Sequence, residues 1–263
     1  MQVQQAIFTS ARTNRMCGYH VVARSAGIGE EIAGRLFAWG PTHASLADPD
    51  WGASSLNFFP LIDPWFAVGR TVYGGPEYSN RGGRQIVTVS LVLSRQQLAG
   101  YDNNPLILAR TARALGHLRL LAAVPERLPT VDLPDCSASC PEPTRCPERV
   151  PDPLVESILE RLRSGRRAAA IGVPEPLPVL EKVFLWTSLP DRLALSFTTG
   201  LKPSQHRPFR LHFLPDDEAI RRQLATLGLD SDLTPPKDLR HLAGVPSRSC
   251  PTSALVAHFS PPG

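Results

Sequence analysis

The stretch Gln4–Gly29, QQAIFTSARTNRMCGYHVVARSAGIG, sets the pattern on which the fold of this chain depends. Two runs rich in β-branched and aromatic residues, VQQAIFTS and YHVVARS, lie on either side of a polar loop at residues 9–18. Such runs around a polar turn predict a pair of β-strands. Four apolar side chains are then expected in the core: Ile7, Phe8, Val21 and Val22. The polar loop is either an active site or only the turn between the two strands.

The segments that follow predict a mixed sheet with flanking helices. EEIAGRLFAW has an acidic first turn and apolar residues at helical spacing, which predicts a helix over 30–39 with Ile32, Leu36 and Phe37 on its buried face. Three further β-rich runs, LNFFPLI, WFAVGRTVYGG and QIVTVSLVLS, predict strands, and the near-continuous apolar pattern of the third suggests a buried position. A helix is expected over 104–124.

Proline divides the chain, because 21 of its 27 prolines lie at or after Pro125. We therefore expect an N-terminal mixed α/β domain at 1–124, a Pro/Cys-rich linker at 125–151, a smaller helical or α+β domain at 152–229 and a Pro-rich tail at 230–263. The predicted fold class is α/β or α+β, with a mixed β-sheet in the first domain and a mostly helical second one.

Three helices and two short strands are expected in the second domain. DPLVESILERLRSG predicts a helix with Asp152 as its N-cap, PLPVLEKVFLW a second helix, and DDEAIRRQLATLG a third. LALSFTTGL and FRLHFLP are short alternating runs that are expected to pair as strands. The tail from Asp230 is expected to dock loosely or to be disordered.

Composition points to a globular protein without a membrane segment. The chain has 263 residues, 42% of them hydrophobic and 20% charged, and it lacks an apolar run long enough to span a bilayer. The N-terminus does not resemble a secretory signal, so a cytoplasmic location is expected. The net charge is +4, but the arginines are spread along the chain, which argues against a nucleic-acid partner.

The five cysteines leave two enzymatic alternatives open. Cys136, Cys140 and Cys146 lie in the linker at a density that suggests structural or catalytic zinc, although the spacing fits no standard finger. Cys17 lies three residues before His20, so a nucleophile and its base are also conceivable there. Incidental loop cysteines and an unrelated strand histidine are the simpler interpretation.

No cofactor is expected. The loop GGPEYSNRGG lacks the lysine and the hydroxyl residue of a P-loop, and GIGEEIAG misses the spacing of a dinucleotide fingerprint.

The candidate partner-binding residues are arginines and large aromatics, the residue types that anchor protein interfaces. RLRSGRR carries the densest positive charge, although an end of a solvated helix is the alternative interpretation. The expected anchors are Arg12, Arg15, Tyr19, Trp51, Trp65, Arg161, Arg163, Arg166 and Arg167.

The opening stretch resembles the N-terminal domain of bacterial GTPase-associated adaptor proteins. The matching positions are Gln4, Gln5, Ser10, Gly18, Tyr19, Ser25 and Gly27, and Ala26 stands where the family pattern has a proline. LALSFTTGLKPSQHRPFRLHF is similar to a segment of the domain that follows in those proteins. The resemblance implies an adaptor without catalytic residues, encoded beside a small GTPase in a multi-component bacterial conflict system.

The sequence therefore predicts a non-enzymatic cytoplasmic adaptor that binds a protein partner, namely a small GTPase or another operon-encoded component. A cysteine- or metal-dependent hydrolase that uses Cys17 or the linker cysteines is the alternative.

Overall fold

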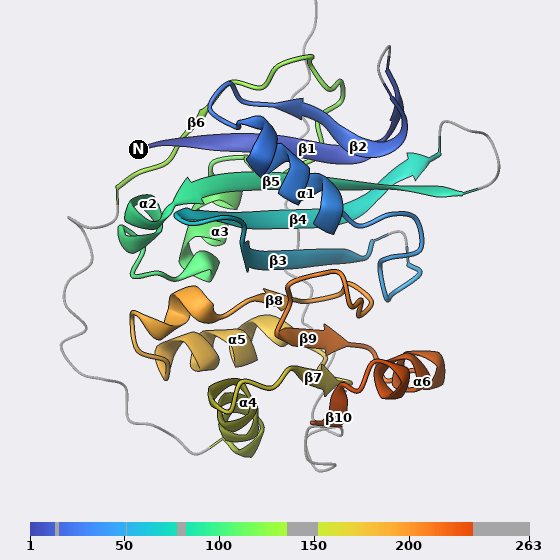
Figure 1. Cartoon of the computed structure of the whole chain (residues 1–263), viewed down its shortest axis with the longest axis vertical. Coiled ribbons are helices and arrows are strands. Elements are labelled where there is room, and N and C mark those ends of the chain that lie inside the picture. Colours follow the sequence, from blue (N-terminus) through green and yellow to red (C-terminus); the bar gives the residue numbers. More distant parts are fainter. Residues whose placement is uncertain (14–15, 51, 78–82, 136–151, 234–263) are drawn as a thin grey trace, which may run out of the picture.

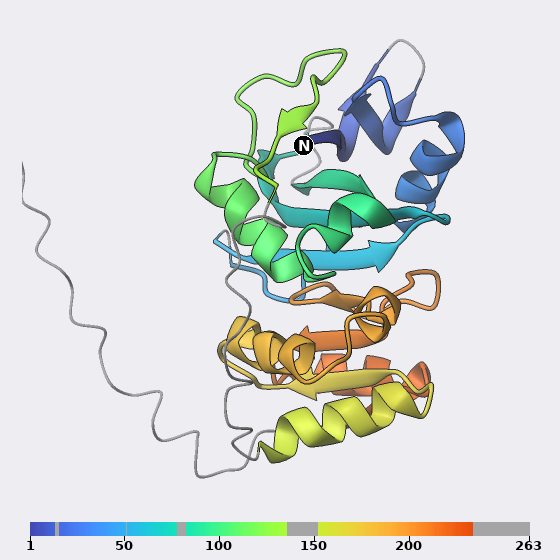
Figure 2. The same cartoon turned by 90° about the vertical axis from the view of Figure 1, so that its left-hand side faces the viewer.

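The computed structural model describes residues 1–13, 16–50, 52–77, 83–135 and 152–233. Within these ranges the strands form one mixed sheet in the order β10-β7-β9-β8-β3-β4-β5-β1-β2, and a further strand, β6, pairs with the start of β1. The strands stack from one end of the molecule to the other, with helices on both faces (Figures 1 and 2). The predicted mixed α/β class is confirmed.

The first half of the sheet is antiparallel. Its strands are β1 (Gln2–Arg12), β2 (Cys17–Arg24), β3 (Ser54–Pro60), β4 (Trp65–Pro76), β5 (Arg84–Ser94) and β6 (Val131–Asp132). The strand pair predicted from the opening stretch is present, with Ser10 opposite Tyr19 and Arg12 opposite Cys17. β5 lies between β1 and β4, and its central residues are buried, as its continuous apolar pattern predicts.

The second half of the sheet is largely parallel. β7 (Ala168–Ile171) pairs in parallel with both β9 (Leu211–Leu214) and β10 (Asp230–Leu233). β8 (Phe197–Thr198) runs parallel to β9 and antiparallel to β3, so it joins the two halves. The predicted pairing of the LALSFTTGL and FRLHFLP runs is thus confirmed.

The helices divide between the two faces of the sheet. One face, with the larger core, is covered by α2 (Arg95–Ala99), α3 (Pro105–Ala114), α4 (Pro153–Arg163) and α5 (Pro176–Leu185). The opposite face is covered by α1 (Glu30–Trp39) and α6 (Glu218–Thr226). α1 lies in front of the antiparallel half in Figure 1, and α3 lies behind it.

Capping accounts for several helix starts. Asp152, the predicted N-cap of α4, accepts a hydrogen bond from the Val155 N–H at 3.3 Å. Its carboxylate also pairs with Lys182 of α5 at 2.6 Å, and the pKa of this carboxyl is lowered. Burial opposes this lowering of the pKa. The hydrogen bonds from Lys182 and from the backbone of Val155 and Leu154, together with the charge of Lys182, outweigh it.

Three details differ from the sequence-based expectations. The helix expected to reach residue 124 ends at Ala114, because Gly116 and Leu118 both adopt positive φ, which a helix cannot accommodate. Residues 168–171, AAAI, carry no alternating pattern and were not expected as a strand, yet they form β7 with both faces covered. The expected tail begins with β10 rather than with a loosely docked segment, and residues 234–263 lie outside the described residues.

The expected linker contributes to the core over its first residues. Leu128, Val131 and Leu133 are buried on the face that carries α3, and β6 pairs with the start of β1. Residues 136–151 lie outside the described residues. The division into domains stays a prediction, and a single sheet spans both of its parts.

Candidate functional sites

The predicted anchors fall at opposite ends of the sheet. Arg12 and Tyr19 belong to the β1–β2 hairpin at one edge. The arginines at 161–167 lie in the last turn of α4 and just after it, and α4 packs beside β7 and β10 near the other edge (Figure 1). These two groups therefore do not form one continuous surface. Arg15 and Trp51 lie outside the described residues.

Tyr19 is a packed side chain rather than a free anchor. Its ring stacks on Phe8, with 6.0 Å between centroids, and lies 6.5 Å from the ring of His43. Its hydroxyl oxygen accepts a hydrogen bond from the Ile86 N–H at 3.2 Å. Burial raises the pKa of the Tyr19 phenol, which keeps the hydroxyl neutral.

Side chains on and beside the β1–β2 hairpin form what we call the hairpin surface, which consists of the half-buried Tyr19 and the exposed Arg12, Met16, Phe37 and His43. Phe37 was expected on the buried face of its helix, but 47% of it is exposed. Its ring and that of the buried Phe8 pack edge to face, with 6.5 Å between their centroids. Met16 in the hairpin turn is 45% exposed. The sequence missed Phe37 because its helical spacing is the same as that of a core residue.

The other predicted anchors are less clustered. Trp65, at the start of β4, is half-buried against the core beneath α1. Arg163, the last residue of α4, and Arg166 are exposed, while Arg161 and Arg167 are partly buried. The Arg166 Nε donates to the Ser164 hydroxyl at 3.2 Å, so this guanidinium is partly held by its own loop.

The structure separates the two members of the candidate cysteine pair. Cys17 is exposed in the hairpin, whereas His20 is buried and its Nδ1 is 2.8 Å from the Gly18 carbonyl oxygen. Cys136, Cys140 and Cys146 lie outside the described residues. Within the described ranges, no three His, Cys, Asp or Glu side chains gather as a metal site.

The residues of the family-like motif fasten β1 to the segment around Pro129. The Ser25 hydroxyl accepts from the Gln5 N–H at 3.0 Å and donates to the Pro129 carbonyl at 2.9 Å, and the Gln5 amide donates to the same carbonyl at 2.8 Å. The Gln4 side-chain oxygen accepts from the Gly27 N–H at 3.1 Å. A Cβ at Gly27 would overlap the amide group of Gln4, so a side chain here would displace this hydrogen bond. These motif positions are therefore structural.

A second feature is a cleft of about 540 Å³ between the two halves of the sheet. One wall comes from the residues that follow β7 and β9 and from the start of α5, and the other from α3, β4 and the segment before β3. Three arginines line it: Arg70 of β4, and Arg110 and Arg113 of α3. Arg110 forms an ion pair across the cleft with Glu181 of α5.

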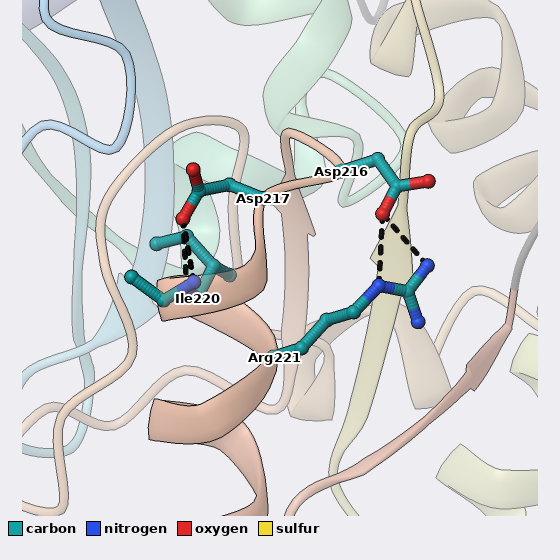
Figure 3. A network of polar contacts seen from close by, with 5 residues as sticks. Asp216, Asp217, Ile220 and Arg221 are labelled. Atoms are coloured by element: carbon teal, nitrogen blue, oxygen red, sulfur yellow. Dashed lines mark hydrogen bonds and ion pairs between the residues drawn. The ribbon is translucent and has the colours of Figure 1, made fainter.

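The turn from β9 into α6 is held rigidly at the edge of this cleft. Asp217 caps α6 by accepting from the N–H groups of Ala219 and Ile220, at 2.9 and 3.1 Å. Asp216 accepts from Arg221 at 2.8 Å on the other side of the turn (Figure 3). Asp216 also packs against Gly172, which follows β7 with a positive φ.

Sequence reasoning did not select the cleft arginines. A signal was present, because Arg70 interrupts the apolar run WFAVGRTVYGG in the middle of a strand, where a charged side chain is rarely buried without a partner. Arg110 and Arg113 are three residues apart on α3 and thus share a helix face.

No helix of the described ranges is long and apolar enough to cross a membrane. Comparisons with curated proteins and with solved structures gave no significant match. A family model described as GTPase-associated protein 1, N-terminal domain type 2, matches residues 2–134, which is just over half of the 263-residue chain. The match contains the antiparallel strands, α1 and the motif residues that fasten β1. The chain therefore belongs to the GTPase-associated protein 1 family, with a type 2 N-terminal domain.

Proposed function

We propose that this protein is a non-catalytic, cytoplasmic adaptor that binds a GTPase, or another component encoded beside it in a bacterial conflict or signalling system, through the hairpin surface. The observation that carries the proposal is that the residues matched by the GTPase-associated family include Arg12, Tyr19 and Phe37. The arginine tract at 161–167 lies beyond the match, so we place it second.

The chemistry of the hairpin surface suits a protein partner. Aromatic residues, methionine and arginine are enriched in protein interfaces relative to the rest of the surface. Phe37 and Met16 expose nearly half of their area, and Phe37 packs on the ring of Phe8, which in turn stacks on Tyr19. A large side chain that is held rigidly and is still exposed loses little conformational entropy on binding.

The geometry of Cys17 favours the adaptor over a cysteine hydrolase. A nucleophilic cysteine needs a base within hydrogen-bond reach, and no hydrogen bond joins the exposed Cys17 to the buried His20 within the described part of the chain.

The decisive experiment is co-purification of the full chain with each GTPase encoded in its gene neighbourhood, followed by titration calorimetry on the partner recovered. Phe37→Ala is expected to weaken binding by about 10-fold or more, the size typical of a central aromatic anchor. Leu185→Ala is the matched control, because Leu185 is 48% exposed and belongs to α5, outside the hairpin surface. Its effect is expected to stay below about 2-fold.

Arginine variants separate the two groups of predicted anchors. Arg12→Ala is expected to weaken binding, and Arg163→Ala, at the end of α4, is expected to leave it unchanged. Loss of binding with Arg163→Ala alone would move the interface to the arginine tract. If no neighbouring GTPase binds the wild-type protein at any salt concentration, the proposed function is wrong.

A further inference from the structure

The cleft between the two halves of the sheet lies where α/β folds place ligands. β7 and β9 are parallel neighbours, and the chain leaves β7 toward α5 on the face of the larger core but leaves β9 toward α6 on the opposite face. Neighbouring parallel strands whose connections separate in this way open a crevice outside their carboxyl ends, where open α/β sheets bind small molecules. Residues at the carboxyl ends of both strands, Gly172 and Pro215, line the cleft.

Two of the three cleft arginines have no carboxylate partner within the described residues. Arg110 is paired with Glu181, whereas the contact recorded for the Arg70 guanidinium is a long one, 3.4 Å to the carbonyl oxygen of Leu118. Arg113 forms no ion pair in the described ranges. Burial lowers the pKa of Arg70, and the charge of Arg113 lowers it further, so the two guanidinium groups repel one another. A bound anion would relieve this repulsion.

The charge and shape of the cleft narrow the class of ligand. Two guanidinium groups that form no ion pair in the described ranges match a phosphate monoester, which carries close to two negative charges at neutral pH, better than a single carboxylate. The first turn of α5 faces the cleft, and its N-cap residue Glu175 makes no side-chain capping hydrogen bond. Pro176 and Pro178 carry no backbone N–H, so among the first three residues of this helix only Leu177 has an N–H for an anion.

The remaining walls are mostly apolar, with Asp48, Ser54 and Thr199 as their polar members beside Glu181, which is paired with Arg110. Leu106, Leu177 and Phe213 contribute to them, and Leu177 is 37% exposed. The volume of about 540 Å³ lies within the range of about 300–1,000 Å³ that is usual for small-molecule sites. An organic group can therefore pack beside the bound phosphate.

We propose that this cleft binds a phosphate-bearing small molecule of mononucleotide size, with its phosphate on Arg70 and Arg113 and its organic part against Leu106, Leu177 and Phe213. Binding would link the family-matched half of the chain to the parallel half, because the two arginines belong to the first and the apolar wall draws on both. The inference does not depend on a GTPase partner, since none of these residues belongs to the hairpin surface.

The test is titration calorimetry of the full chain, without any partner, against the four common nucleoside 5′-monophosphates, ribose 5-phosphate and inorganic phosphate. We expect at least one organic phosphate to bind with a Kd below about 1 mM and at least about 10-fold more tightly than inorganic phosphate, because the apolar wall contributes. Arg113→Gln is expected to weaken that binding by about 10-fold or more, since it removes one charged hydrogen-bonding partner of the phosphate.

Arg119→Gln is the matched control, because Arg119 is also exposed and follows α3 but does not line the cleft. It is expected to change the affinity by less than about 2-fold. Thermal unfolding of both variants without ligand verifies that each is folded. Absence of binding to every organic phosphate, an equal affinity for inorganic phosphate, or an equal loss with Arg119→Gln would overturn the proposal.

Discussion

Replacing Asn57 with alanine tests the buried polar network that ties β8 to the antiparallel half of the sheet. Asn57 on β3 is 2% exposed. Its side-chain oxygen accepts from the hydroxyls of Ser55 and Thr198 at 2.8 and 2.7 Å, and its amide nitrogen donates to the Thr71 hydroxyl at 3.0 Å. Thr71 continues the network to Thr88 of β5 at 2.9 Å.

The expected loss of stability follows from these three bonds. A buried hydrogen bond contributes about 1 kcal/mol net, so Asn57→Ala is expected to lower the free energy of unfolding by about 3 kcal/mol. For a chain of this size that corresponds to a Tm lower by roughly 6–12 °C. The assay is urea unfolding followed by far-ultraviolet circular dichroism, with Tm measured in parallel.

Two controls make the result specific. Ser54→Ala alters an exposed residue on the same strand and is expected to change stability by less than about 0.5 kcal/mol. A double-mutant cycle of Asn57→Ala with Thr71→Val is expected to give a coupling energy of about 1 kcal/mol, because the two side chains share one hydrogen bond. A loss below about 1 kcal/mol for Asn57→Ala, or a coupling energy of zero, would show that the network does not hold the halves together.

Three further predictions concern pH, backbone and helix capping. Burial lowers the pKa of His212 from 6.5 to about 4, so on acidification the unfolded chain takes up the proton before the folded chain does. The free energy of unfolding is therefore highest above pH 6.5 and falls as the pH is lowered toward 4. The loss should approach about 3 kcal/mol and should vanish in His212→Gln; an unchanged pH slope in that variant, measured by urea unfolding between pH 4 and 8, would contradict the assignment. Gly34→Ala, whose new methyl group meets no atom, is expected to stabilise α1 by about 0.5–1 kcal/mol. Gly40→Ala places its methyl group against the Phe8 ring and is expected to destabilise the protein by about 1–3 kcal/mol. Equal Tm values for the two variants would refute this contrast. Asp217→Ala removes the cap of α6 and is expected to cost about 1 kcal/mol in urea unfolding, with Asp217→Asn retaining most of the stability; an equal loss in both variants would argue against capping.

The features that the sequence predicted correctly depend on neighbouring residues. The β-rich runs around the opening loop predict β1 and β2, the continuous apolar run predicts the buried β5, and Asp152 predicts the start of α4. Each of these signals is a local pattern of apolar residues or a capping residue that involves only a few neighbouring positions. The secondary structure at these positions can therefore be predicted without the tertiary fold. β7 was not predicted because its three alanines and one isoleucine carry no alternating or helical pattern of apolar residues. Whether such a segment forms a strand depends on the sheet and helices that pack around it.

Sequence alone therefore determined the mixed α/β class, most of the helices and strands, and the family motif, whose polar side chains fasten β1 to the segment around Pro129. Tertiary structure alone decided which distant side chains meet. It exposed Phe37 over the Phe8 ring, separated the hairpin from the arginine tract, and brought Arg70 and Arg113 to one cleft at the carboxyl ends of β7 and β9. The physical reason is that charge repulsion and burial depend on distance in space. Arg70 and Arg113 come together when α3 packs on the antiparallel strands, and the cleft beside them is completed only when β8 joins the parallel strands to β3.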